Sequence, residues 1–306
     1  MKIAIIGRSE VLYDTVKILI EYGHMITCIV TSKETPEYTK TASDFQSLAS
    51  DLSVPFVRTA QIADVQEMLE SSKSDIAVSF NYSGVIPSII TDIFPLGILN
   101  AHGGDLPRYR GNACQAWAIL NGETKIGLCI HKMIGGELDS GDIVARDYMN
   151  IDETTKVTKA WEWLNEKIPY LFVDAIKNLT IDRSYNIEKQ SKKHSDAHRC
   201  YPRKPEDGRI DWRQSALQIL RLINASNKPY AGAFCLYGSS PFIIWDAELV
   251  NEYENFSAMP GQVTKIGHDY IEVACSGSKL RILSAELSGK VSVPTVWINS
   301  IRSRLL

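Results

Sequence analysis

The sequence predicts an α/β fold in which an open, mostly parallel sheet is followed by a smaller β-barrel. Over the first half of the 306-residue chain, short apolar runs alternate with amphipathic helical segments, as in strand–helix–strand units. After about residue 200 the pattern changes to short alternating strands separated by Gly, Ser, Pro and Asn, which is typical of a small barrel. We therefore predict two domains, residues 1–197 and residues 198–306.

The strands of the first domain are expected where apolar residues run together, because a parallel strand is buried on both faces. They are residues 1–7, 25–31, 54–57, 75–80, 97–100, 128–133 and 142–145. Helices are expected where apolar residues recur every three or four positions, at residues 10–22, 46–52, 61–70 and 158–178. Polar residues directly follow several of these strands, at the sheet edge where open α/β sheets bind ligands.

The predicted boundary near residue 198 lies within a polar, irregular stretch at residues 179–209 that contains the charged run SKKHSDAHR. A helix is expected at residues 215–224, and residues 232–287 carry the short strands of the barrel. Its aromatic residues are expected mainly in the barrel core: Trp212, Tyr230, Phe234 and Trp245.

Composition and charge argue against several classes of function. The formal net charge of −3 argues against tRNA or DNA as the main partner, because phosphate-binding surfaces carry a basic excess. No segment approaches the ~18 apolar residues that span a bilayer, and the start MKIAIIG has no cleavage pattern after it. The six cysteines form no CxxC pair, which indicates free thiols. We expect a cytoplasmic protein that binds neither nucleic acid nor membrane.

The most informative stretch runs from residue 99 to residue 144. Asn100 and His102 lie two apart at the end of an apolar strand, so their side chains project from the same side. Two glycines and a Leu-Pro turn follow, and Asp139 opens a second turn, DSGD. Taken singly, each of the three polar residues is an ordinary turn or core residue.

The joint pattern resembles the folate-dependent formyltransferase family. NxHxxxLPxxxG, followed after the next predicted strand by a DxG turn, is similar to this family, and the flanking segments YRGNACQAW, NGE, CYPRKPED and PYAGAF extend the resemblance over nearly the whole chain. It implies a Rossmann-like catalytic domain over residues 1–197 and an OB-like barrel over residues 198–306. It also implies that N10-formyltetrahydrofolate is the co-substrate, that no metal is needed, and that the catalytic trio is Asn100, His102 and Asp139.

Formyl transfer suits these three side chains. The reaction passes through a tetrahedral intermediate whose oxygen is negatively charged, and a hydrogen-bond donor such as Asn100 or His102 stabilises it by about 2.7–4 kcal/mol. The incoming amine must lose a proton, which an imidazole that titrates near neutral pH can accept. The carboxylate of Asp139 would orient that ring, favour its charged form or relay protons through water.

The resemblance also implies binding residues. The pterin is expected against the loop after residues 75–80 and beside the DSGD turn, which gives the cofactor candidates Phe80, Asn81, Tyr82, Ser83, Gly84 and Asp142. The acceptor candidates combine cations for a diphosphate with the loop after His102, namely Arg8, Ser9, Gly103, Gly104, Arg203 and Lys204. His131, in an apolar strand pattern, is expected to support the site or pack in the core.

Two features depart from the family pattern. Relatives commonly have Ser-Leu-Leu-Pro where this chain has Gly104-Asp105-Leu106-Pro107, and the segment from His131 to Asp139 is one residue longer than in several of them. The sequence leaves the role of Asp105 open.

The acceptor is expected to be an amino-deoxy sugar linked to UDP, dTDP or CMP. Methionyl-tRNA formyltransferases carry a basic, glycine-rich insertion that residues 31–47 lack, and glycinamide ribonucleotide formyltransferases lack the second domain. Such sugars are used in bacterial surface polysaccharides, and a pseudaminic-acid-type pathway would fit. Three alternatives remain: a methionyl-tRNA formyltransferase, a hydrolase that releases formate from formyl-folate, and a non-catalytic module that binds sugar nucleotides. The chain could also form a homodimer.

Overall fold

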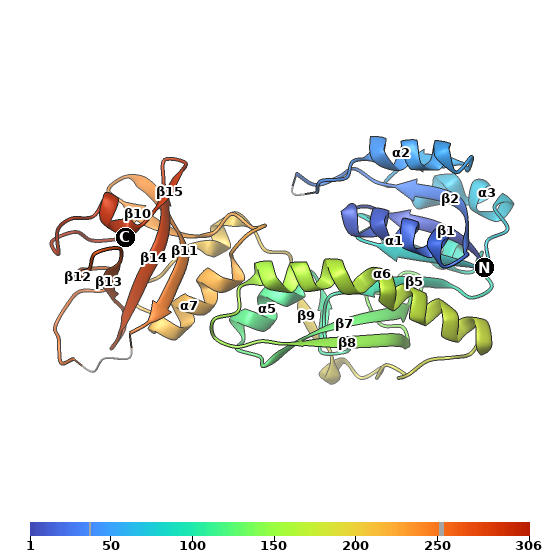
Figure 1. Cartoon of the computed structure of the whole chain (residues 1–306). Helices are drawn as coiled ribbons and strands as arrows, with labels where there is room; N and C mark the ends of the chain where they lie inside the picture. Colours follow the sequence, from blue (N-terminus) through green and yellow to red (C-terminus); the bar gives the residue numbers. More distant parts are fainter. Residues whose placement is uncertain (37, 251–253) are drawn as a thin grey trace. The chain divides into compact units, whose positions relative to one another are not determined.

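The computed structural model describes residues 1–36, 38–250 and 254–306, which divide into two compact units (Figure 1). Unit 1 comprises Met1–Cys114, Gly127–Met149 and Glu162–Cys200, and unit 2 comprises Gln115–Ile126, Asn150–Trp161 and Tyr201–Leu306. The division at residue 197 stays a prediction.

Unit 1 is built on a seven-stranded sheet with the order β3-β2-β1-β4-β5-β7-β8. The strands are β1 (Lys2–Gly7), β2 (Met25–Thr31), β3 (Phe56–Arg58), β4 (Ile76–Phe80), β5 (Ile98–His102), β7 (Lys125–Lys132) and β8 (Ile143–Asn150). β3, β2, β1, β4 and β5 pair in parallel, whereas β7 runs antiparallel to β5. The predicted α/β architecture with a mostly parallel sheet is confirmed.

Helices cover both faces of this sheet because its central strands are apolar on both sides. On one face, Ile3 and Ile5 pack in the same cluster as Leu12 of α1 (Glu10–Glu21) and Phe172 of α6 (Val157–Ile181). On the other face, Ala4 and Ile6 pack with residues of the 3₁₀ turn η1 (Ile62–Val65), α3 (Gln66–Ser71) and α4 (Ser88–Thr91). The uninterrupted run at the start of the chain therefore supplies both halves of the core.

Two predicted helices differ from those observed. The helix expected at residues 46–52 is α2 (Ala42–Asp51), which begins earlier because Thr41 caps it: the Thr41 N–H donates to the Asp44 carboxylate at 2.8 Å. The helix expected at residues 61–70 is divided into η1 and α3. A short helix, α5 (Cys114–Leu120), was not predicted.

A two-stranded ribbon joins distant parts of unit 1. The strand β6 (Tyr109–Gly111) pairs in parallel with β9 (His198–Cys200), so a segment expected to be irregular lies beside the loop after β5. Gly111 is opposite Cys200, and Asn112 N–H donates to the Cys200 carbonyl at 3.1 Å.

Unit 2 contains the helix α7 (Ala216–Ala225) and a six-stranded antiparallel sheet with the order β10-β11-β14-β13-β12, in which β15 also pairs with β14. The strands are β10 (Ala233–Tyr237), β11 (Ser240–Leu249), β12 (Val263–Ile266), β13 (Ile271–Ala274), β14 (Lys279–Leu287) and β15 (Lys290–Ser292). Leu306 N–H donates to the Leu236 carbonyl at 2.9 Å and Leu305 N–H to the Gly261 carbonyl at 2.8 Å. Trp212 is buried in this core, whereas Tyr230, Phe234 and Trp245 are half-buried.

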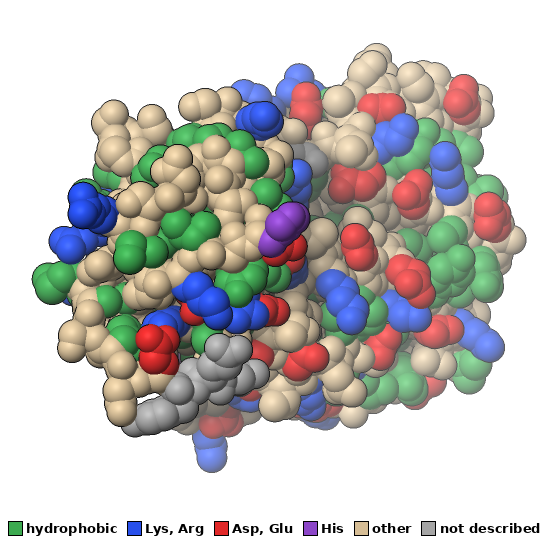
Figure 2. Space-filling model, turned by 60° about the vertical axis from the view of Figure 1, so that its left-hand side comes forward, with side chains coloured by type: hydrophobic (Ala, Val, Ile, Leu, Met, Phe, Trp, Pro, Cys, Tyr) green, Lys and Arg blue, Asp and Glu red, His purple; other side chains and the backbone are tan. Residues whose placement is uncertain are grey.

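The surface mixes charges of both signs. Lys and Arg side chains lie among Asp and Glu side chains over the face shown in Figure 2. All six cysteines are buried and free. Within residues 1–36, 38–250 and 254–306, no helix has the length and apolarity needed to cross a bilayer, and no cluster of His, Cys, Asp and Glu could hold a metal ion.

Candidate active site

The end of β5 presents two of the predicted catalytic side chains. β5 lies between β4 and β7, and its register places Asn100 opposite His131 and His102 opposite Cys129 of β7. Asn100 Nδ2 lies 3.3 Å from His131 Nε2. The rings of His102 and His131 meet edge to face with 6.3 Å between their centroids.

Asp139 lies in the turn between β7 and β8 and faces both histidines. Its Oδ2 is 3.5 Å from His102 Nδ1, and its Oδ1 is 3.5 Å from His131 Nε2. Gly111 N–H donates to Oδ2 at 2.9 Å, and the Gln190 side chain donates to the Asp139 carbonyl at 2.9 Å. The structure thus brings the three predicted catalytic residues together, although they come from two different segments.

The carboxyl group of Asp139 is held in its charged form. Its burial alone would raise its pKa, but His102, then His131, and the Gly111 N–H outweigh that effect and hold the pKa of Asp139 well below its usual range. At neutral pH Asp139 is therefore a carboxylate that can only accept hydrogen bonds.

The loop after β5 fixes which nitrogen of His102 can exchange a proton. His102 Nε2 lies 2.6 Å from the Tyr109 carbonyl oxygen, which can only accept, so Nε2 carries a hydrogen. Nδ1 is left to exchange a proton, and it faces Asp139. The ring lies so close over Gly104 that a Cβ there would be 2.6 Å from Nε2, which explains the glycine.

His131 takes a larger part in the site than the sequence indicated. Its Nδ1 lies 3.1 Å from the Lys132 carbonyl and donates to it. Its Nε2 therefore either accepts from the Asn100 amide or, when protonated, donates to Asp139. In the first of these states His131, which is 1% exposed, restricts the orientation of Asn100. Its only signal in the sequence was its place in a strand that could pair with the strand of Asn100.

A cavity of about 340 Å³ opens in front of these four side chains. Three of the predicted folate residues line it: Asn81, Tyr82 and Gly84. Among the other lining residues are Gly111, Asn112, Met133, Glu137, Leu138 and Arg199. Asn112 and Arg199 were missed by the sequence analysis because they reach the cavity only through the pairing of β6 with β9.

Three other folate candidates do not line this cavity. The Phe80 side chain is 5% exposed and packs in the core of unit 1. Among the residues that the structure describes, Ser83 does not line the cavity. The carboxylate of Asp142 accepts a hydrogen bond from Gln190 N–H at 3.3 Å, which helps to hold the turn.

The acceptor candidates Arg8 and Ser9 lie at the carboxyl end of β1. Arg8 Nε donates to the Asn81 carbonyl at 2.8 Å, and its guanidinium also donates to the Lys33 carbonyl and lies over the Tyr38 ring. Arg8 therefore ties together the loops that follow β1, β2 and β4. Ser9 is 1% exposed, and its hydroxyl has no hydrogen-bond partner among the residues described.

Gly103 and Gly104 precede the turn at Leu106, and Gly104 packs under the His102 ring. The remaining candidates, Arg203 and Lys204, belong to unit 2. Arg203 NH1 donates to the Ala225 carbonyl at 3.1 Å and NH2 to Ser226 Oγ at 3.0 Å, so this side chain covers the carboxyl end of α7.

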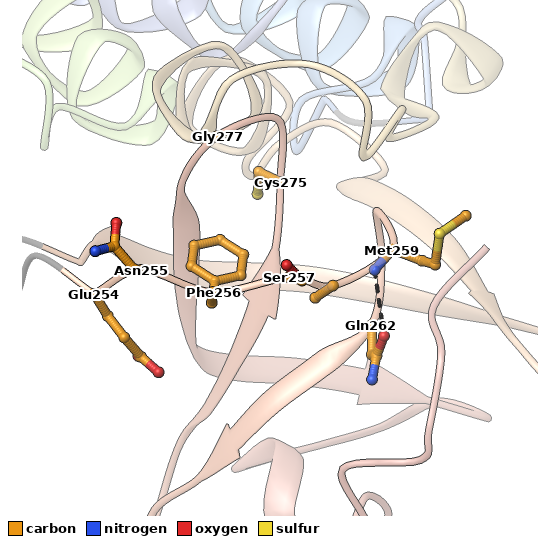
Figure 3. A pocket seen from close by; sticks show the side chains of 9 residues that line it. Glu254, Asn255, Phe256, Ser257, Met259, Gln262, Cys275 and Gly277 are labelled. Atoms are coloured by element: carbon orange, nitrogen blue, oxygen red, sulfur yellow. Dashed lines mark hydrogen bonds between the residues drawn. The ribbon is translucent and has the colours of Figure 1, made fainter.

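A second cavity, of about 680 Å³, lies in unit 2 (Figure 3). Its lining includes Phe256, Gln262 and Cys275, and the Gln262 side chain accepts from Met259 N–H at 3.3 Å. Burial raises the pKa of the Cys275 thiol to about 12, which makes it a poor nucleophile. The candidate active site is the other cavity, because Asn100, His102 and Asp139 line it together.

Both units match known families. Residues 1–176 match the family model described as formyl transferase, and residues 203–302 match the model described as formyl transferase, C-terminal domain.

Solved structures with a similar fold include those of the following three proteins. WlaRD, a sugar 3N-formyl transferase determined in the presence of dTDP and 5-N-formyl-THF, has a TM-score of 0.68 and 18% identity over 95% of this chain and 98% of its own. The N-formyltransferase from Helicobacter canadensis, in complex with folinic acid and dTDP-3-aminofucose, has a TM-score of 0.68 and 15% identity over 92% and 99%. HypX from Aquifex aeolicus, in complex with tetrahydrofolic acid, has a TM-score of 0.64 and 17% identity over 98% and 47%, so the chain spans about half the length of HypX.

Proposed function

The chain belongs to the formyl transferase family, and on that premise we propose that it transfers a formyl group from N10-formyltetrahydrofolate to the amine of a nucleotide-linked amino-deoxy sugar. One observation carries the proposal: an amide, an imidazole and a buried carboxylate, those of Asn100, His102 and Asp139, converge at the wall of one cavity. That set can stabilise a negative oxygen and accept a proton at the same place.

The formyl carbon would lie in front of Asn100, whose amide has two hydrogens. His131 can accept one of them, and the other is free to donate to the oxygen that becomes negative as the amine attacks. The folate nitrogen supplies the leaving group. The amine loses a proton to His102 Nδ1 as its bond to the formyl carbon forms, and Asp139 stabilises the resulting imidazolium. The same proton can then pass to the departing folate nitrogen.

We assign the folate to the side of the cavity formed by the loop after β4. Asn81, Tyr82 and Gly84 line that side, and Phe80 and Ser83 flank them in the sequence. Asp142 contributes by holding the turn of Asp139 through Gln190. Support for the ligand comes from the folates with which the WlaRD, Helicobacter canadensis and HypX structures were determined.

The acceptor would approach from the side of the β6–β9 ribbon. Arg199 lines the cavity there and is a suitable contact for a diphosphate. It is proposed in addition to the earlier acceptor candidates Arg8, Ser9, Gly103 and Gly104. Arg203 and Lys204, which belong to unit 2, remain candidates for acceptor binding. The dTDP ligands of the two sugar formyltransferases support a sugar nucleotide, and UDP and CMP remain alternatives for its nucleotide.

The wider context follows from this acceptor. A formylated amino sugar would serve bacterial surface polysaccharides, for example in a pseudaminic-acid-type pathway, and the enzyme would work in the cytoplasm, where reduced folates are found. We also propose that the sheet of unit 2 is an OB-like barrel, because the last residues of the chain bond to β10 on one side and to Gly261, just before β12, on the other.

A panel of UDP-, dTDP- and CMP-linked amino sugars, each incubated with formyl-folate, tests the proposal. We expect one or a few of them to gain a formyl group, with loss of the amine. Formate released at the same rate without any acceptor would instead indicate a hydrolase. If methionyl-tRNA were the only acceptor used, the sugar assignment would be wrong. Stabilisation by the sugar nucleotide alone, without turnover, would indicate a binding module.

A further inference from the structure

The loop between β5 and β6 is held by the side chain of Asp105, whose role could not be predicted from the sequence. Asp105 Oδ1 accepts from Arg146 NH1 of β8 at 2.8 Å and from the Tyr148 hydroxyl at 3.0 Å. Arg146 NH2 donates to the Leu106 carbonyl at 2.8 Å. The side chains of Arg146 and Asp105 are only 12% and 16% exposed, so solvent screens this pair weakly.

The same loop carries the carbonyl that fixes the His102 ring. Tyr109 N–H donates to the Asp105 carbonyl at 3.1 Å, and the Tyr109 carbonyl in turn accepts from His102 Nε2 at 2.6 Å. The backbone of Asp105 also packs closely on β7, since a Cβ at Gly127 would lie 2.6 Å from the Asp105 Cα. A displacement of Asp105 would therefore move the Tyr109 carbonyl.

We propose that the partly buried ion pair between Asp105 and Arg146 is a positioning device for His102, which acts through the carbonyl of Tyr109. The carbonyl keeps the hydrogen of His102 on Nε2, so the ring presents Nδ1 to Asp139 and to the amine. Without the pair, the carbonyl moves, the alternative tautomer becomes accessible, and the proton-accepting nitrogen no longer faces the substrate. This inference rests on the proposed function, because it concerns the base of that reaction.

The variant Asp105→Asn tests the proposal, since it keeps the size of the side chain and removes its charge. We expect kcat to fall about 10- to 100-fold, the size of effect that misplaced catalytic groups produce, while KM for both substrates stays within about threefold. In the ¹⁵N NMR spectrum of the imidazoles, His102 should change from the pure Nε2–H form to a mixture of tautomers. The variant His102→Gln identifies the His102 signals.

A matched control removes the other carboxylate that binds the same guanidinium. Glu188 Oε2 lies 2.9 Å from Arg146 NH2 but does not bond to the loop of Asp105 among the contacts described. Glu188→Gln should therefore leave both kcat and the His102 tautomer close to wild type. A loss equal to that of Asp105→Asn would mean that Arg146 only stabilises the fold.

Two results would overturn the proposal: an Asp105→Asn enzyme with unchanged kcat, or one with reduced kcat and an unchanged His102 tautomer. If Asp105→Asn does not fold, Tyr148→Phe provides a milder change, because it removes one hydrogen bond to Asp105 and should shift the same two measurements by a smaller amount. The NMR measurement needs no substrate. If no sugar acceptor is found, the proposed function fails while the tautomer still decides this inference.

Discussion

Replacement of Asp139 by Asn removes the negative charge that lies beside both histidines and keeps the shape of the side chain. In the structure the carboxylate lies 3.5 Å from a nitrogen of each imidazole and is 11% exposed. At that distance, with an effective dielectric constant near 20, Coulomb's law gives about 5 kcal/mol for one full pair of charges. Relaxation and the remaining hydrogen bonds recover part of this energy, so we expect about 10²- to 10³-fold lower kcat.

The assay is steady-state formyl transfer with both substrates varied, together with single-turnover measurement to isolate the chemical step. Glu137→Gln is the matched control, because Glu137 lines the same cavity and carries the same charge but bonds to Ser140 rather than to a histidine. We expect its kcat to lie within about threefold of wild type. Equal losses in both variants, or a rise in KM alone for Asp139→Asn, would refute a role for Asp139 in stabilising the imidazolium.

Three further predictions concern the same cavity. Asn100→Ala should lower kcat by ~10²-fold or more, and a rise in KM with unchanged kcat would make Asn100 a binding residue only. Arg199→Ala should raise KM for the sugar nucleotide about tenfold and leave KM for the folate unchanged. Arg8→Ala should raise KM for the folate as well, because Arg8 holds the Asn81 carbonyl. Identical effects of the two variants would show that the folate and acceptor sides of the cavity are wrongly assigned. The folded-state pKa of Asp139 is lowered, so its contribution to stability is complete above the unfolded value of about 3.9 and is lost as pH falls through the lower folded-state pKa. The difference between the thermal melts of wild type and Asp139→Asn should therefore shrink as pH falls below about 3.9, and a difference that widens there would contradict this.

The strands and the position of the trio could be predicted because each depends on local sequence. A run such as residues 3–6 has no polar face, so it must be a buried strand, and the period of two along β5 directs Asn100 and His102 to one side. Asp139 was added to these two residues from the resemblance to the formyltransferase family, and the match to the formyl transferase model confirms that resemblance.

Contacts between distant segments could not be predicted in this way. β9 has three residues and lies in a polar stretch, and its pairing with β6 depends on no local pattern, so Arg199 was missed. The bond of Arg8 to the Asn81 carbonyl and the ion pair of Asp105 with Arg146 likewise join positions 73 and 41 residues apart. Such pairs are set by the packing of the whole sheet, which a single sequence does not specify.

The fate of the formyl carbon tests the central claim most directly. Formyl-folate labelled with ¹³C at that carbon would be incubated with the enzyme and the amino-sugar nucleotide selected from the panel, and the products followed by NMR. The account predicts that the label appears in an amide on the sugar and that Asn100→Ala, His102→Asn and Asp139→Asn each slow its appearance. Label that collects in formate, or that reaches the sugar at the wild-type rate in all three variants, would contradict it.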